Sequence, residues 1–268
     1  MKTLTNRTRA ALLVLPVLLA ASAACDIAMS EQREKETAEW RKSYQMQPGG
    51  RLEIGNVNGK IDVRRGEGNT VEVVAMKIAH GPSKESAKEA LDRITIQEEA
   101  STSLVKIETK LRRGDGGMFS GGNLQVQYTV TVPSHLEVRV TTVNGGVEVS
   151  GLEGRVVAEA TNGGVRGSDL AGAVEASTTN GGVEIDLAKV SDAGVKLETT
   201  NGGIKLRLPA DARASISARI VNGGIDTEGL SIQSSGENSK RRLDGNLNGG
   251  GPRIQLEGTN GGISIRPR

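Results

Sequence analysis

The chain has 268 residues, of which 34 are basic and 32 acidic, so its formal net charge is +2 at pH 7. The basic residues form no patch beyond a short SKRR at 239–242, which excludes a nucleic-acid-binding protein, because such proteins carry a basic patch or stripe. Only four residues are aromatic and 36 are glycine, so we expect a narrow aliphatic core and frequent turns.

Residues 1–24 have the order of a secretory signal peptide: basic residues, an apolar run at 10–21, then small residues. The run is too short to span a bilayer. The single cysteine, Cys25, follows in ASAAC, which resembles a bacterial lipobox with Ser22 in place of the usual leucine. The resemblance implies a lipid on Cys25 and a location in the bacterial cell envelope, facing the periplasm or the exterior. Cleavage that leaves a free thiol is the alternative.

The segment that follows divides into a tether and a β region. Residues 25–39 are charged and lack an apolar period, which indicates a lipid-anchored tether, with a marginal helix as the alternative. Region 40–135 is predicted to be mostly strand, with a tight turn at Asn58. One helix is expected at about 83–94, with Ser83 as its N-cap.

A glycine-rich loop, RRGDGGMFSGG, separates two predicted strands of this region. It carries two large apolar side chains, Met118 and Phe119, at its centre. We expect them to contact a partner or a membrane, or to fold back and cover an open end of the repeat stack.

Region 136–268 repeats the motif NGG. From Asn144 to Asn222 the copies are 18, 18, 21 and 21 residues apart, and a period near 20 is typical of a solenoid. Apolar residues recur at alternate places on both sides of each Asn, so each unit offers two short strands with one apolar face. The predicted corner residues are Asn144, Asn162, Asn180, Asn201, Asn222 and Asn260.

The charge pattern favours a parallel stack over an antiparallel meander. The place four residues after the Asn carries a charge whose sign alternates from unit to unit. Parallel stacking would put these residues about 4.8 Å apart, whereas a meander would separate them by a strand. We therefore predict an all-β fold, a β-solenoid (β-helix-like) of NGG-cornered repeats with one short helix in the N-terminal part. The alternating residues are Glu148, Arg166, Glu184, Lys205 and Asp226.

The NGG motif itself has two interpretations. Asn and Gly tolerate sharp turns, and stacked Asn amides can hydrogen-bond along a column, which makes the motif structural. Alternatively, a row of Asn and Thr side chains forms a glycan-binding strip. We favour the structural role.

The sequence offers no catalytic or metal-binding constellation. The two histidines, His80 and His135, lie far apart in the sequence, and no catalytic or metal-binding motif accompanies either. NGGVRGSDL is similar to a calcium-binding nonapeptide, but Arg166 occupies the place of a required glycine. We expect no enzyme activity, no metal and no cofactor.

A family resemblance rests on VQYTVTVPSHLEVRVTTVNGGVEVSGLEG, on the repeated TNGG[VI] and on the closing NLNGGGPRIQLEGTNGGISI. These segments resemble a bacterial β-strand-repeat family of lipoproteins, adhesin-like and of unknown function. The resemblance covers most of 52–267 and implies a β-solenoid and an envelope location. It carries no functional residues across, because its motifs are turn and strand patterns.

Taken together, the sequence indicates a non-enzymatic cell-envelope lipoprotein, a structural or interaction module that presents a solenoid surface. Its expected partners are the membrane, through the N-terminal lipid, and an envelope protein or glycan, but no nucleic acid. Two alternatives stay open: an envelope polysaccharide-binding protein or degenerate lyase-type β-helix, and an accessory factor in envelope stress.

Overall fold

The computed structural model describes residues 34–112, 124–235 and 238–268, which belong to one unit that begins at Arg33. The predicted leader, the acylation site at Cys25 and the residues Met118 and Phe119 lie outside the described residues.

The described residues form strands and one helix. In chain order the elements are β1 (Glu34–Gln45), β2 (Arg51–Asn58), β3 (Ile61–Gly66), β4 (Thr70–Gly81), α1 (Lys84–Leu91), β5 (Ile94–Ala100), β6 (Leu104–Leu111), β7 (Gln125–Pro133), β8 (Glu137–Asn144), β9 (Val147–Ser150), β10 (Val156–Asn162), β11 (Val165–Leu170), β12 (Val174–Asn180), β13 (Val183–Leu187), β14 (Val195–Asn201), β15 (Ile204–Leu208), β16 (Ala214–Asp226), β17 (Ile232–Ser234), β18 (Arg242–Leu247) and β19 (Arg253–Pro267).

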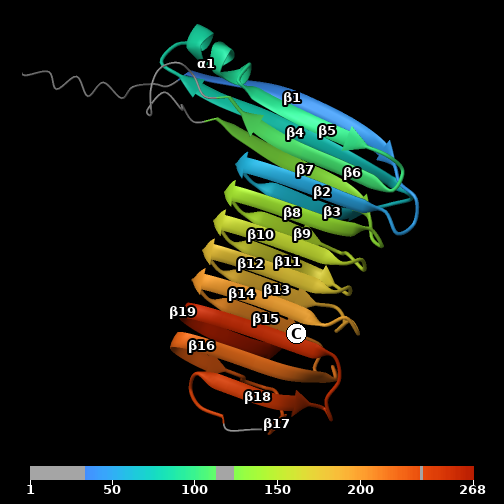
Figure 1. Ribbon diagram of the computed structural model, residues 1–268, viewed down its shortest axis with the longest axis vertical. Helices are drawn as coiled ribbons and strands as arrows, with labels where there is room; N and C mark the ends of the chain where they lie inside the picture. Colours follow the sequence, from blue (N-terminus) through green and yellow to red (C-terminus); the bar gives the residue numbers. More distant parts are fainter. Residues whose placement is uncertain (1–33, 113–123, 236–237) are drawn as a thin grey trace, which may run out of the picture. The chain divides into compact units, whose positions relative to one another are not determined.

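Strand pairs stack in parallel through the middle of the unit (Figure 1). The strands before the corners pair in the order β2, β8, β10, β12, β14, β19, β16, and those after the corners in the order β3, β9, β11, β13, β15, β19, β16. We call each strand pair joined at a corner a coil. β16 and β19 run through their corners and contribute to both series. The prediction of an all-β fold with one short helix in the N-terminal part is confirmed.

Two features of the stack were not predicted. The coil of β2 and β3 lies in the region expected to precede the repeats, yet it pairs directly with β8 and β9, and Asn58 is in register with Asn144. In addition, β19 lies between β14 and β16, so Asn260 stands between Asn201 and Asn222. The stacking order differs from the chain order because β18 pairs with one edge of β16 and leaves the other edge for β19.

Two predicted boundaries were wrong at the N-terminal end. β1 begins at Glu34, so residues 34–39 are strand and not tether. Its side chains are mostly exposed and it pairs only with β4 among the described strands, which explains the missing apolar period. The helix ends at Leu91, and Ile94 already belongs to β5. Ser83 is the N-cap as predicted, and its hydroxyl accepts a hydrogen bond from the Ser86 backbone N–H at 3.2 Å.

The core is one continuous cluster of valine, isoleucine, leucine and alanine side chains. Alternate residues of the stacked strands β8, β12 and β14 are buried, so the pleat points one face inward and leaves the other for solvent. Tyr128 is 1% exposed near the N-terminal end, and its hydroxyl shares a hydrogen bond of 2.7 Å with Thr109. Burial raises the pKa of Tyr128 to about 12.

The corners require glycine at one place only. Gly202, the first glycine of its corner, has φ +155°, and a Cβ there would lie 1.9 Å from the carbonyl oxygen of Gly181 in the next coil. A Cβ on Gly203, the second glycine, would lie 3.4 Å from the nearest atom, the Gly262 oxygen. The close approach of neighbouring backbones therefore requires glycine at the first place of the corner and only weakly favours it at the second.

These two glycines form a matched pair for mutation. Gly202→Ala is expected to lower the free energy of unfolding by about 3 kcal/mol, because strain and a clash with backbone coincide. Gly203→Ala should change it by less than about 1 kcal/mol. Urea denaturation followed by circular dichroism measures both, and equal losses would contradict the assigned role of close approach.

Candidate functional site

The six predicted corner asparagines form a hydrogen-bonded ladder together with Asn58, which stands at one end, with Asn222 at the other. The side-chain amide nitrogen of each of the six donates to the side-chain oxygen of the next asparagine toward β2. The bonds are Asn144 to Asn58 (2.7 Å), Asn162 to Asn144 (2.9 Å), Asn180 to Asn162 (2.9 Å), Asn201 to Asn180 (2.9 Å), Asn260 to Asn201 (2.8 Å) and Asn222 to Asn260 (2.8 Å).

The backbone at the same corners donates in the opposite direction. The N–H of Gly145 donates to the Asn162 carbonyl at 2.9 Å, and the N–H of Gly181 donates to the Asn201 carbonyl at 2.9 Å. Side-chain and backbone amides thus form two adjacent columns with opposed dipoles. Each interior asparagine side chain donates a hydrogen bond to one neighbouring asparagine and accepts one from the other. The arrangement therefore supports a structural role more than ligand binding.

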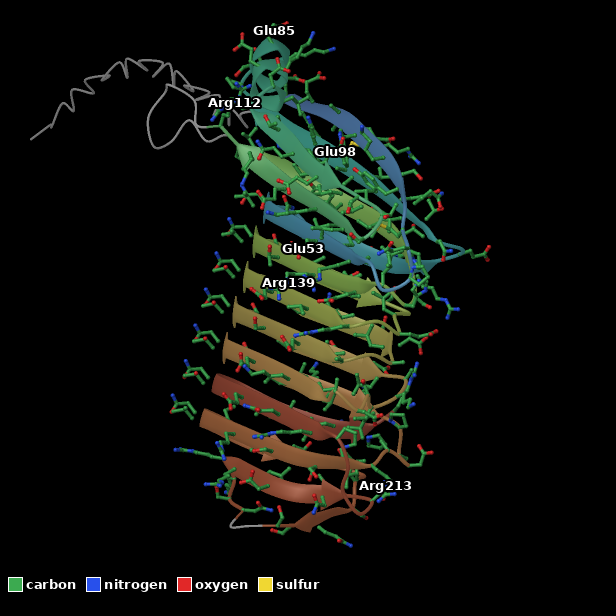
Figure 2. The ribbon with its side chains drawn as sticks, turned by 45° about the vertical axis from the view of Figure 1, so that its right-hand side comes forward. Glu53, Glu85, Glu98, Arg112, Arg139 and Arg213 are labelled. Atoms are coloured by element: carbon green, nitrogen blue, oxygen red, sulfur yellow. The ribbon has the colours of Figure 1, made fainter. Side chains whose placement is uncertain are left out.

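A threonine groove of about 820 Å³ runs beside this ladder across the outer face of the strands that precede the corners. Two parallel columns of outward-facing residues line it, one directly before the asparagines and one two residues earlier. Figure 2 shows side chains repeating along this face, where Glu53 of β2 and Arg139 of β8 are in register. The columns are Thr161, Thr179, Thr200 and Thr259, and Glu159, Ser177, Glu198 and Glu257.

Between these columns lie buried threonines that also line the groove and connect it to the corners. The hydroxyl of Thr178 donates to the carbonyl of Gly163 at 2.7 Å, and that of Thr199 donates to the carbonyl of Gly181 at 2.9 Å. Since these hydroxyls are used internally, the exposed threonines of the neighbouring column are the ones that can meet a ligand.

The acidic residues of the groove already have partners. Glu159 lies 3.7 Å from Arg139, and Glu198 lies 2.8 Å from Lys196. Glu257 accepts a hydrogen bond of 2.7 Å from the side chain of Gln255. The groove is therefore lined mainly by residues with neutral hydroxyls, and these three carboxylates are engaged with neighbouring side chains.

The opposite outer face carries the charge column. Arg166 lies between Glu148 and Glu184, at 3.4 Å and 3.9 Å, and is in register with both. Lys205 is in register with Glu184, as expected. Asp226 is not its neighbour, because Ser264 of the inserted β19 stands between them.

Asp62 extends this charge column beyond Glu148. Lys60 lies 3.5 Å from Asp62 and 2.5 Å from Glu148, so it offsets the repulsion between the two carboxylates. Arg64 donates two hydrogen bonds to Asp62, at 2.9 and 2.7 Å, and these bonds lower the pKa of that carboxyl. The pairs of Arg166 with Glu148 and Glu184 are exposed and contribute little to stability, about 0–1 kcal/mol each, so this part of the column serves mainly to favour register.

The described residues hold no group of histidine, cysteine and acidic side chains arranged for a metal ion. Within the same residues no helix is long and apolar enough to cross a membrane. The sequence predicts a turn at Asn58 but not its place in the ladder, because Lys60 replaces the second glycine there. A row of Asn and Thr side chains was expected as an alternative role of the motif, but the groove beside the ladder was not.

Together, the stacked coils and the groove define a repetitive β protein that offers a long polar surface. The chain belongs to the Toastrack DUF4097 family, whose model matches residues 51–266. The resemblance to a bacterial β-strand-repeat, adhesin-like family is thereby confirmed. No curated protein matches the chain.

Comparison with solved structures finds matches at low sequence identity, and one of them has a TM-score above 0.5. A candidate cell adhesion protein from Clostridium sporogenes is 12% identical with a TM-score of 0.53, over 87% of this chain and all of that one. A candidate adhesin from Bacteroides fragilis is 10% identical with a TM-score of 0.38, over 86% of this chain and 97% of that one. A candidate lipid-binding protein from Parabacteroides distasonis is 10% identical with a TM-score of 0.24, over 87% and 96%.

The loss of stability on replacing a ladder asparagine should depend on how many side-chain hydrogen bonds that asparagine makes. Asn180→Ala removes two side-chain bonds and is expected to lower the free energy of unfolding by about 2 kcal/mol, whereas Asn222→Ala removes one and should cost about 1 kcal/mol. Equilibrium unfolding in urea gives both values. A larger loss at Asn222 than at Asn180 would contradict the ladder as a source of stability.

Proposed function

We propose that the chain is a non-enzymatic, adhesin-like interaction module of the bacterial cell envelope, and that the threonine groove is its contact surface. The observation that carries this proposal is the groove itself, which crosses consecutive coils and presents a column of threonines along its length. NGG-cornered repeats act here as scaffold, holding the exposed threonines in line.

The groove suits binding because it is ordered before a partner arrives. Its threonines project from strands that are hydrogen-bonded on both sides, and β-branched side chains have few rotamers to lose. Little conformational entropy is therefore lost when a partner docks, which favours affinity from many weak polar contacts.

The partner that this lining favours is a linear polysaccharide of the envelope, the second candidate function. Hydroxyls repeat at the strand spacing of about 4.8 Å along Thr161, Thr179, Thr200 and Thr259, and a polymer with regular hydroxyl groups can meet them in series. A lyase is less well supported, because the carboxylates in the groove are engaged with Arg139, Lys196 and Gln255.

A bulky, positively charged side chain placed in the groove tests whether this surface binds a partner. Thr179→Arg should lower binding of the purified chain to immobilised envelope fractions at least about tenfold, which corresponds to 1.4 kcal/mol. Ser168→Arg, on the exposed face of β11 in the other strand series, is the matched control and should leave binding unchanged.

The fractions are compared before and after protease treatment and before and after periodate oxidation, which separates protein partners from glycans. Equal effects of Thr179→Arg and Ser168→Arg, or the absence of binding to every fraction, would contradict the proposal.

We also propose that Cys25 carries a lipid and tethers the module to a membrane. In the producing bacterium the wild-type chain should incorporate labelled palmitate and partition into detergent, and Cys25→Ser should do neither. Incorporation of label by Cys25→Ser, or recovery of the wild-type chain free in the aqueous phase, would contradict acylation at this residue.

A further inference from the structure

The end of the ladder at Asn222 differs from all its other positions. The chain has eight Asn-Gly sequences, at Asn58, Asn144, Asn162, Asn180, Asn201, Asn222, Asn248 and Asn260. Asn222 donates to Asn260, but among the described residues no donor reaches its side-chain oxygen. It is thus the ladder member held by one side-chain bond, whereas interior members have two.

Asn58 and Asn248, the other two Asn-Gly sites outside the ladder's interior, have more side-chain hydrogen bonds than Asn222. The amide of Asn58 donates to the Leu124 carbonyl at 3.2 Å and its oxygen accepts from Asn144. Asn248 donates to the carbonyls of Ala210 and Ala212, at 3.0 and 2.8 Å.

The backbone around Asn222 is also less supported. β18 covers only Ala214–Arg219 of β16, so in the described strands the rest of β16 pairs with β19 alone. Two further bonds hold this edge: Ile220 donates to the Arg241 carbonyl and Ile225 to the Lys240 carbonyl, both at 3.0 Å. Asn222 lies between these two points, on the outermost strand of its series.

We infer that Asn222 is a modification site, at which the chain deamidates spontaneously and faster than at its other Asn-Gly sequences. The backbone nitrogen of Gly223 attacks the side-chain Cγ of Asn222. A bond from nitrogen to Cγ forms, the bond from Cγ to Nδ2 breaks, and the amide leaves as ammonia with the proton of the attacking nitrogen. Water then opens the cyclic imide to aspartate or isoaspartate.

The hydrogen bonds determine where this happens. Ring closure requires the side chain to leave its partners and the backbone to reorient, so the rate follows local opening. The product matters for the ladder, because an oxygen replaces the donor that faces Asn260 at 2.8 Å. The new carboxylate also lies beside Val221, which lines the threonine groove.

The test uses the eight sites as mutual controls. The purified chain is aged at mildly alkaline pH and digested with trypsin, which places each Asn-Gly sequence in its own peptide. Mass spectrometry should show that the peptide 220–240 deamidates roughly two- to tenfold faster than the other seven. This is the factor expected when a side chain is held by one hydrogen bond fewer. Equal rates, or faster conversion at an interior site, would overturn the inference.

A second variant moves the end of the ladder. Asn260→Ala removes the donor to the Asn201 oxygen, so the peptide 197–205 should join the fast class. The peptides that hold Asn144 and Asn162 should stay slow, because their side-chain bonds are intact. If all sites accelerate together, global unfolding governs the reaction and the inference fails.

Discussion

Close backbone approach at the corners is the constraint on which the stack depends. A carbonyl of one coil occupies the space where a Cβ of the next would lie, as at Gly202 and Gly181. Only a glycine permits that contact, and with it the coils reach the spacing at which backbone amides and asparagine side chains bond in two columns. Register is then determined at every coil, because a slip by one residue would place a side chain in the contact and expose the buried faces.

The regular outer surface follows from this register. Identical places in successive coils become neighbours in space, so a preference for threonine before the corner becomes one wall of a groove. The same register pairs Arg166 with Glu148 and Glu184 on the opposite face. The aliphatic core between the faces can be thin, because hydrogen bonds along the stack supply order that a broad core supplies in other folds.

Much of this architecture could be predicted from the sequence because its signals are local and repeated. The NGG spacing, the alternating apolar places and the Ser83 cap each lie within a short window. The insertion of β19 could not be predicted, because it depends on which edge of β16 the segment 242–247 occupies, a long-range choice without a local signal. β1 was not predicted for a different reason. It is an edge strand with mostly exposed side chains, and its sequence therefore has the same charged, aperiodic character as a linker.

The candidate site was predictable only in its parts. The corner asparagines were predicted from the sequence. The groove was not, because its lining residues are far apart in the sequence and come together only when the coils stack. Nothing in the sequence distinguishes Thr178, whose hydroxyl is used by Gly163, from Thr179, which faces solvent. That difference arises from the pleat, which turns adjacent residues to opposite faces.

The position of β19 has a consequence for the order of folding. The ribosome makes β16 before β19, yet β19 fills the gap between β14 and β16. Until it arrives, the growing stack ends at an unpaired strand, and β16 has no native neighbour on that side. β19 is therefore an internal layer of the stack although it is made after both of its neighbours, and the stack is completed from within.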